Sequence, residues 1–379
     1  MRIALFSKAF LPNVGGIETS SAMMAKIWQA AGHDVEVITA VSDAAPASEP
    51  YTVTRVWTLK SLMTGIRRAD IVVVNGYARV AIAASVIGRR RAIVFHQGYQ
   101  LICSDGLGFR GRRFHGFDTW KDIRLAFGAG LRSGLQAIGR VPFDAVVKRL
   151  RYRVQHVVPS HHVAKRLGLV NFRVIYQPPN PAVIEGIRSQ GAYTEDLRTS
   201  AYESGDILFF GRLVFEKGCD DLIRAYALWR QRSAGDLRRK TIPRLVIYGQ
   251  GPEQTNLENL VGSLQITEHV NLRPFVGGRE LVRVARDASV VVIPSCWEEP
   301  GGTIGVELFA CGAAVIASER GVFGEIFKDH GRLFSNRDVE GLADALGQHF
   351  AIGPIFPRPT GMEPWLFPAI EREVLRVIS

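Results

Sequence analysis

The sequence predicts an α/β protein with two doubly wound parallel-sheet domains. Short runs rich in valine and isoleucine alternate with longer segments of helical period, a pattern typical of buried parallel strands joined by crossover helices. The chain has 379 residues, which exceeds the size at which a single hydrophobic core usually stops growing. Hydrophobic residues make up 47% of it and charged residues 22%, so we expect folded domains and not disorder.

The predicted elements form two series. In the first, strands are expected at residues 3–6, 35–39, 71–74, 92–95 and 154–159, with a helix at about 19–31. In the second, strands are expected at residues 207–210, 245–248, 270–272, 290–293 and 314–317. Three prolines at 178, 179 and 181 separate the series, because proline cannot continue a helix or a central strand. We therefore predict domains at 1–180 and 181–350, with a helix within 363–379 packing back on the first.

The cysteine spacing and the apolar runs indicate a cytoplasmic protein. Cys103, Cys219, Cys296 and Cys311 show no CxxC spacing, which argues against a zinc site or a disulfide framework. The N-terminal run is short and is predicted to be a first strand and not a signal peptide. The sequence contains no uninterrupted run of about 20 apolar residues, the length needed to span a bilayer.

The net charge of +11 is concentrated in residues 105–153. Eleven basic residues face four acids there, and aromatic and aliphatic residues are interleaved with them. This composition suits peripheral contact with an anionic membrane or a phosphorylated acceptor. A solvated basic face is the alternative. Nucleic acid is not expected as a partner, because no nucleic-acid motif accompanies the charge.

A glycine-rich turn follows the expected strand at 290–293. Glu299 lies in this turn and Glu307 in the helix that follows, with Gly302, Thr303 and Ile304 at the helix start. A strand, a turn and a helix N-terminus present N–H groups to phosphate. Carboxylates accept hydrogen bonds from sugar hydroxyls. Dipole complementation by the two glutamates is the simpler alternative.

A second motif follows the strand at 207–210 and begins with Gly211. Arg212 and Lys217 leave the carboxyl end of that strand, where open α/β sheets bind ligands, and both suit phosphate. Gly249 and Gly251 cluster similarly after the next strand. Alone, each motif could be an ordinary surface loop.

The first domain carries fewer signals. Gly15 and Gly16 follow the first strand, where they allow a ligand to approach the backbone or simply form a tight turn. They are not part of a GxGxxG fingerprint. His96 ends the strand at 92–95, from which it would project toward a cleft. A lone histidine is more often structural, but this position makes His96 a stronger candidate than the other histidines. No Asp-x-Asp metal motif follows any strand, so we expect no required cofactor and no metal.

Taken together, these motifs resemble the family 4 retaining glycosyltransferases. The resemblance rests on GGIE at 15–18, GRLVFEKG at 211–218, the Glu299 and Glu307 pair, and SERGVFGE at 318–325. It implies a GT-B fold, with two Rossmann-like domains facing across a cleft. Gly301 and Leu308 depart from the family pattern, which commonly has an aromatic residue and an alanine there.

The resemblance also implies roles for the candidate residues. Arg212 and Lys217 would bind the donor diphosphate, Glu299 the sugar hydroxyls and Glu307 the ribose. His96 would line the cleft near the anomeric carbon, and the glycine pair at 15–16 would border the acceptor. A sugar would pass, with retention, from a nucleotide-diphosphate sugar to an acceptor hydroxyl, with a saccharide or lipid-linked saccharide as the expected acceptor.

Two other functions remain open at this stage. A sugar-nucleotide epimerase would use the same architecture, although it ordinarily relies on several carboxylates. A non-catalytic subunit that binds nucleotide sugar is the second alternative, although such a scaffold has no physical need for Arg212, Lys217, Glu299 and Glu307 together.

Overall fold

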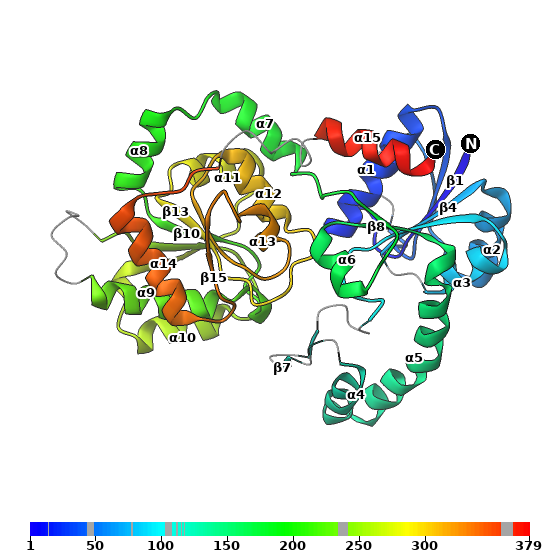
Figure 1. Ribbon diagram of the computed structural model, residues 1–379, viewed down its shortest axis with the longest axis horizontal. Coiled ribbons are helices and arrows are strands. Elements are labelled where there is room, and N and C mark those ends of the chain that lie inside the picture. The colour runs from blue at the N-terminus through cyan, green and yellow to red at the C-terminus, as the bar shows by residue number, and fades with distance from the viewer. Residues whose placement is uncertain are drawn as a thin grey trace. The chain divides into compact units, whose positions relative to one another are not determined.

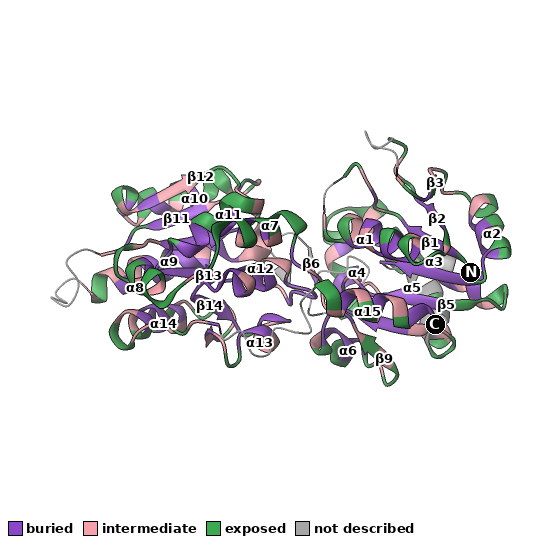
Figure 2. Ribbon diagram, turned by 90° about the horizontal axis from the view of Figure 1, so that it is seen from above, coloured by how far each residue is buried: buried purple, intermediate pink, exposed green. Residues whose placement is uncertain are grey.

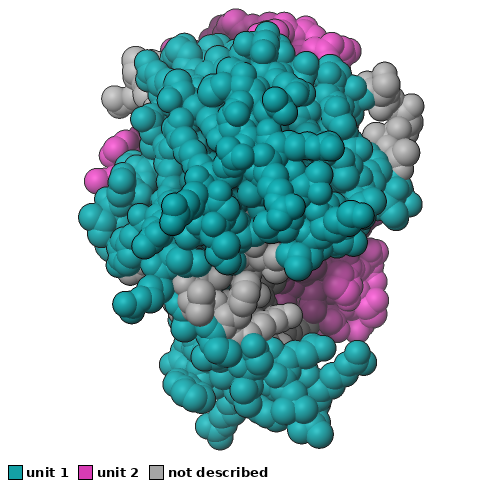
Figure 3. All heavy atoms as spheres, turned by 90° about the vertical axis from the view of Figure 1, so that its right-hand side faces the viewer, with its two compact units in different colours: residues 1–177, 367–379 teal, residues 178–366 magenta. Residues whose placement is uncertain are grey.

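The computed structural model consists of two compact α/β units. Unit 1 comprises Met1–Gln177 and Phe367–Ser379, and unit 2 comprises Pro178–Leu366; Figure 3 colours them separately. The structure describes residues 1–13, 15–43, 49–76, 79–102, 108–110, 113–114, 116, 118–233, 242–357 and 367–379. Residues 105–107, 111–112, 115 and 117 of the basic segment at 105–153 therefore lie outside the described residues, as does Cys103.

Unit 1 is built on a seven-stranded parallel sheet with the strand order β3-β2-β1-β4-β5-β8-β9. Its strands are β1 (Arg2–Ser7), β2 (Asp34–Ile38), β3 (Thr52–Thr54), β4 (Ile71–Asn75), β5 (Arg91–Phe95), β8 (Gln155–Val158) and β9 (Phe172–Val174). A separate short hairpin pairs β6 (Phe109–Arg110) with β7 (Arg113–Phe114). Its helices are α1 (Gly16–Ala30), α2 (Leu59–Arg68), α3 (Arg79–Ile87), α4 (Thr119–Gly128), α5 (Leu131–Leu150), η1 (Arg151–Arg153), α6 (His161–Leu167) and α15 (Phe367–Ile378).

Both faces of this sheet are buried, because side chains alternate along each strand. On β1, Ile3 and Leu5 join one core cluster with α1 and α15, whereas Ala4 and Phe6 join another with α2, α3 and α6. The C-terminal helix α15 is part of the first cluster, where Trp28 Nε1 on α1 donates a hydrogen bond to its Val374 carbonyl at 3.0 Å. Helices α1 and α15 lie side by side in Figure 1.

Unit 2 has a six-stranded parallel sheet in the order β12-β11-β10-β13-β14-β15, the strand order of Rossmann domains. Its strands are β10 (Ile207–Phe210), β11 (Leu245–Tyr248), β12 (Val270–Arg273), β13 (Val290–Ile293), β14 (Val315–Ser318) and β15 (Arg332–Phe334). Its helices are α7 (Pro181–Gln190), α8 (Glu195–Ser204), η2 (Phe215–Lys217), α9 (Cys219–Arg232), α10 (Gln254–Ser263), η3 (Thr267–His269), α11 (Gly278–Arg286), α12 (Thr303–Cys311), α13 (Phe323–Ile326) and α14 (Val339–Ile352).

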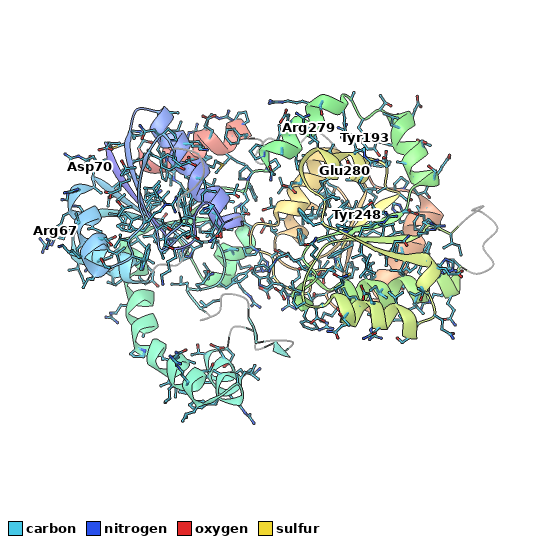
Figure 4. The ribbon with its side chains drawn as sticks, turned by 180° about the vertical axis from the view of Figure 1, so that it is seen from behind. Arg67, Asp70, Tyr193, Tyr248, Arg279 and Glu280 are labelled. Carbon is cyan, nitrogen blue, oxygen red and sulfur yellow. The ribbon has the colours of Figure 1, made fainter. Side chains whose placement is uncertain are left out.

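The sheet of unit 2 is also covered on both faces. Helices α9, α10 and α14 contribute to one core cluster, and α7, α11, α12 and α13 contribute to the other. Helices α7 and α11 are also joined at the surface by an ion pair between Arg279 and Glu185; Figure 4 labels Arg279. Figure 2 shows the strands of both sheets largely in the buried colour. The predicted doubly wound α/β class is thus confirmed in each unit.

The observed bounds differ from the predicted ones by small amounts. Strands β10, β11 and β13 coincide with the runs expected from the sequence. Helix α1 begins at Gly16, three residues before the expected start, with Gly15 as its N-cap. The chain passes between units at Gln177 and Pro178. Helix α7 then begins at Pro181, where proline is favoured because the first turn has no partner for an N–H group.

Candidate active site

The polar candidates of unit 2 lie at the carboxyl ends of its two central strands. The strand order reverses between β10 and β13. Open α/β sheets bind their ligands outside the carboxyl ends of the strands at such a switch point. The loop after β10 carries Arg212 and Lys217, and the loop after β13 carries Glu299.

The two loops are held together by hydrogen bonds. The backbone N–H of Cys296 donates to the Glu216 carbonyl at 3.0 Å, and Ser295 Oγ lies 3.2 Å from the same carbonyl oxygen. Gly218 is required at this junction, because a Cβ there would lie 2.0 Å from the Pro294 carbonyl oxygen. The loop after β10 is therefore fixed against the loop after β13.

Lys217 and Glu299 form an ion pair across this junction. Both side chains are largely buried. Ser295 Oγ lies 3.2 Å from Glu299 Oε1, and its one hydroxyl hydrogen can be donated either to this carboxylate or to the Glu216 carbonyl. The Lys217 ammonium also lies 5.9 Å from the centre of the Trp297 ring. Burial makes such a pair costly to break, since either partner alone would leave an uncompensated charge. The structure therefore places one fixed cation and one fixed carboxylate at the switch point.

Arg212 lies differently from Lys217. Its side chain is 68% exposed, and its nearest acid is Glu216 on the same loop, at 3.8 Å. The structure therefore leaves the Arg212 guanidinium available to a ligand, without bringing it into the buried pair.

Glu307 lies on the first turns of α12 and is buried, with 8% of its surface exposed. Its Oε1 accepts a hydrogen bond from the Asn180 backbone N–H at 3.0 Å. Burial raises the pKa of the Glu307 carboxyl to about 7, although the hydrogen bond from Asn180 opposes the shift. A buried carboxylate with a raised pKa gains from hydroxyl donors supplied by a ligand.

The start of α12 has the geometry of an anion site. Gly302 caps the helix with φ at 53°, in the left-handed region that favours glycine, and Thr303 and Ile304 form the first turn. The N-cap residue is glycine and so has no side chain to cap this end. Backbone N–H groups there, together with the helix dipole, favour a negatively charged group.

The glycines after β10 and β11 have a packing role. A Cβ on Gly249 would lie 2.0 Å from the Gly211 carbonyl oxygen, and one on Gly251 would lie 2.2 Å from that of Leu213. The Leu213 N–H donates to the Gln250 carbonyl at 2.8 Å. These glycines therefore let two loops pack backbone to backbone. The sequence alone did not distinguish this packing role from direct contact with a ligand.

A partly buried ion pair that the sequence analysis missed supports the Glu299 loop. Glu298 is 4% exposed, and its Oε1 accepts a hydrogen bond from Arg320 Nη2 at 3.0 Å. The Val322 N–H donates to the Glu299 carbonyl at 2.9 Å. These contacts join the loop after β14 to the loop after β13. The sequence alone did not show which of the adjacent glutamates, 298 or 299, would pair with Arg320 and which with Lys217.

Unit 1 has its own polar cluster at its switch point, between β1 and β4. Asn75 Nδ2, at the end of β4, donates to Ser21 Oγ at 2.7 Å and to Ser20 Oγ at 3.0 Å. Gln97 Nε2 donates to Asn75 Oδ1 at 2.8 Å, and Gln177 Nε2 donates to Gln97 Oε1 at 2.6 Å. The sequence analysis missed this cluster, although polar residues at strand ends were the available signal.

Gly15 and Gly16 lie at the start of α1. Gly15 is extended, with φ at −176°, and its missing side chain leaves room for the Glu18 carboxylate. A Cβ on Gly16 would lie 3.7 Å from Gln177 Oε1, an ordinary contact. The first turn of α1 thus adjoins the polar cluster of unit 1.

His96 follows β5 and is 3% exposed. Its Nε2 lies 2.8 Å from Nδ1 of His156 on the adjacent strand β8, and the two rings stack. Burial lowers the pKa of His96 to about 3, and His156 adds to the effect. His96 is therefore neutral at physiological pH, and one ring nitrogen is already bonded within the protein.

The fold and these sites correspond to a known class. Residues 199–351 match the model of the family described as glycosyl transferases group 1. This range covers most of unit 2 and includes Arg212, Lys217, Glu299 and Glu307. Unit 2 thus carries the match to the glycosyl transferases group 1, and the chain as a whole has the GT-B fold of two Rossmann-like domains.

Individual relatives agree with this class. A D-inositol 3-phosphate glycosyltransferase of Saccharomonospora viridis is 35% identical over 150 residues, which cover 38% of this chain and 34% of the relative. One from Mycobacterium sp. (strain KMS) is 32% identical over 262 residues, covering 66% and 55%. The chain thus spans less than two thirds of the length of these curated relatives.

Solved structures share the fold over the whole chain. Sucrose-phosphate synthase from Thermosynechococcus elongatus has a TM-score of 0.66 at 17% identity, covering 100% of this chain and 98% of that one. HepE from Anabaena, solved with UDP-glucose, has a TM-score of 0.65 at 17% identity, covering 100% and 99%. At these identities the similarity establishes the fold alone.

Proposed function

We propose that the protein is a glycosyltransferase that moves a sugar from a nucleotide-diphosphate sugar to an acceptor hydroxyl. The observation that carries the proposal is the buried Lys217 and Glu299 pair at the switch point of unit 2, within the group 1 match. Beside it, the α12 N-terminus offers N–H groups to phosphate. Glu307 offers a buried acceptor for the ribose hydroxyls.

The proposed chemistry needs stabilisation of a departing diphosphate. Negative charge grows on the diphosphate as the bond to the anomeric carbon breaks. Lys217, Arg212 and the first turn of α12 would stabilise that charge without a metal ion or another cofactor. Glu299 would hold the sugar hydroxyls and keep Lys217 in place.

Retention of configuration is part of the proposal. A leaving phosphate oxygen would take the proton of the acceptor hydroxyl on the same face of the sugar. His96, neutral because its pKa is about 3, would act in this step as a hydrogen-bonding group near the anomeric carbon and not as a cation. Gly15 and Gly16 would border the acceptor.

UDP-glucose is the first donor to test. HepE is described in complex with UDP and with UDP-glucose. For the acceptor we propose a lipid-linked saccharide in cell-surface polysaccharide or glycolipid synthesis. WaaG is described as a glycosyltransferase involved in lipopolysaccharide biosynthesis, and the basic segment at 105–153 suits a peripheral contact with the inner membrane face from a cytoplasmic location.

Donor binding is testable without knowing the acceptor. Thermal stabilisation by a panel of UDP, GDP and ADP sugars should single out one nucleotide, because a ligand that binds only the folded state raises its stability. Lys217→Met should destabilise unit 2, because it leaves Glu299 without its cation, and should lose transfer by about 100-fold or more when assayed at a temperature where it is folded. The exposed Lys165→Met is the matched control and should keep full activity.

Two results would overturn the proposal. One is stabilisation by none of the nucleotide sugars, and the other is a wild-type transfer rate in Lys217→Met. Release of an epimerised nucleotide sugar in a donor-only incubation would instead favour the epimerase alternative.

A further inference from the structure

Exposed apolar side chains are concentrated on two consecutive helices of unit 1. Among the described residues, sixteen large apolar or aromatic side chains are exposed, and five of these lie on α4 and α5. They include Trp120 at 78% exposure and Leu131 at 69%. We call α4 and α5, residues 119–150, the α4–α5 hairpin. Figure 1 shows α5 extending away from the sheet of unit 1, with α4 beside its outer end.

The hairpin has a small core of its own. Ile123 and Ala126 of α4 pack with Ala137 of α5. The helices approach closely at Gly134, where an added Cβ would lie 2.3 Å from the Phe127 ring. The inner faces of both helices are therefore already occupied.

The outer face of α5 is an exposed stripe. Leu131, Leu135 and Ile138 are exposed, and the spacing of four and then three residues places them on one side of the helix. Pro142 and Ala145 continue the same spacing and are also exposed. From Leu131 to Ala145 the stripe spans about 21 Å of the helix. It is formed by residues other than those of the hairpin core.

The charge around the stripe is strongly positive. Between residues 118 and 153 the sequence has eight basic residues and three acids, which gives 8 − 3 = +5. Four of the exposed basic side chains on the two helices are Lys121, Arg124, Arg132 and Arg149. Asp118 caps α4 by accepting hydrogen bonds from the N–H groups of Trp120 and Lys121, both at 2.9 Å. Asp122 is buried.

This combination of charge and apolar surface selects one partner. A second copy of the chain would place two faces of the same positive charge against each other. An anionic bilayer instead supplies negative headgroups for the basic residues and an apolar layer for the stripe. Within the described residues, no helix has the length and hydropathy to cross a bilayer. The hairpin fits a helix pair that lies on the surface.

We propose that the outer face of the α4–α5 hairpin inserts into the interface of an anionic membrane, with Leu131, Leu135 and Ile138 at the centre of the inserted stripe. The exposed arginines and lysines contact lipid phosphates, and Trp120 lies at headgroup depth. This inference rests on the membrane-facing part of the proposed function and assigns it to one element. The basic residues attract the hairpin to anionic lipid, and the apolar stripe allows it to insert.

The test uses the full-length protein and vesicles of defined composition. Binding is measured by flotation with vesicles of phosphatidylcholine alone and with vesicles that also contain phosphatidylglycerol. Leu131→Gln/Leu135→Gln/Ile138→Gln removes the stripe without touching the hairpin core. Ile87→Gln/Val170→Gln/Ile352→Gln is the matched control, because these three side chains are also exposed, at 77%, 92% and 78%.

We expect the wild type to bind the anionic vesicles and not the neutral ones, and to bind them less well in high salt. The stripe variant should bind about tenfold less or weaker still, whereas the control variant should match the wild type. Vesicles containing brominated lipid should quench the fluorescence of the wild type more than that of Trp120→Phe, because Trp120 lies at the membrane.

Three outcomes would overturn the inference. The stripe variant could bind vesicles as well as the wild type does, or the wild type could bind neutral and anionic vesicles equally. The third is that the wild type and the control variant are dimers in solution whereas the stripe variant is a monomer, which would assign the stripe to a second copy of the chain. Nucleotide-sugar affinity, measured without vesicles, distinguishes this failure from failure of the proposed transferase. Loss of vesicle binding with unchanged donor affinity would show that the stripe acts at the membrane alone.

Discussion

Glu307→Gln is the most informative substitution in unit 2. The change removes the titrating group but keeps Oε1 as an acceptor for the Asn180 N–H. Burial raises the pKa of Glu307 from 4.5 to about 7. At 1.36 kcal/mol for each pKa unit, ionised Glu307 costs the folded state about 3 kcal/mol.

The sign of the effect follows from the direction of the shift. Below about pH 4.5 the carboxyl is protonated in both the folded and the unfolded state, and no cost arises. As the pH rises from about 4.5 to about 7, the unfolding free energy of the wild type falls by about 3 kcal/mol. Relative to the wild type, Glu307→Gln should therefore gain about 3 kcal/mol of unfolding free energy across this range.

Urea unfolding at several pH values measures this difference. Hydrogen exchange of the β10 and β13 amides reads unit 2 separately from unit 1. The exposed Glu258→Gln on α10 serves as the control and should follow the wild type. If Glu307→Gln showed the same pH dependence as the wild type, the raised pKa and the argument from burial would be refuted.

The same substitution tests the ribose role. Hydroxyl donors favour the carboxylate, so wild-type affinity for UDP-glucose should fall below about pH 7, by up to about tenfold per pH unit. UDP-glucose suits this calorimetric test because its diphosphate has no proton that titrates near neutral pH. Glu307→Gln should bind weakly at every pH, with a flat profile. Wild-type affinity in this variant would contradict contact with the ribose.

Two further predictions concern buried charge. Arg320→Ala should destabilise unit 2 by about 3–5 kcal/mol, because it takes the guanidinium away from buried Glu298. As a control, Arg283→Ala breaks an exposed pair with Glu280 and should change the unfolding free energy by less than about 1 kcal/mol. Equal effects of the two substitutions would contradict this reasoning. Because the pKa of His96 is lowered to about 3, unit 1 should lose up to about 5 kcal/mol as the pH falls from about 6.5 to about 3; a His96→Gln variant with an unchanged acid profile in urea unfolding would disprove this.

The fold class could be predicted because it depends on local patterns. Runs such as Ile207–Phe210 and Val290–Ile293 are apolar throughout, which is required of strands buried on both faces. The loops after those strands could be singled out because parallel strands bring their carboxyl ends to one edge of the sheet. Position along a strand was therefore sufficient to nominate Lys217 and Glu299.

Side-chain partners could not be predicted, because they depend on distant parts of the chain. His96 and His156 are 60 residues apart, and Glu307 and Asn180 are 127 apart. Nothing local distinguishes a histidine that bonds another histidine from one that faces a ligand. Likewise, the role of Gly249 depends on the backbone of a neighbouring loop.

The C-terminal helix of unit 1 has a consequence for biosynthesis. Trp28 is fully buried against α15, yet the ribosome makes this helix only after all 189 residues of unit 2, from 178 to 366. At about 5–20 residues per second, that interval lasts about 10–40 s. During it, the apolar surface around Trp28 is open to chaperones and to other nascent chains. The half of the protein that is synthesised first therefore completes its core last.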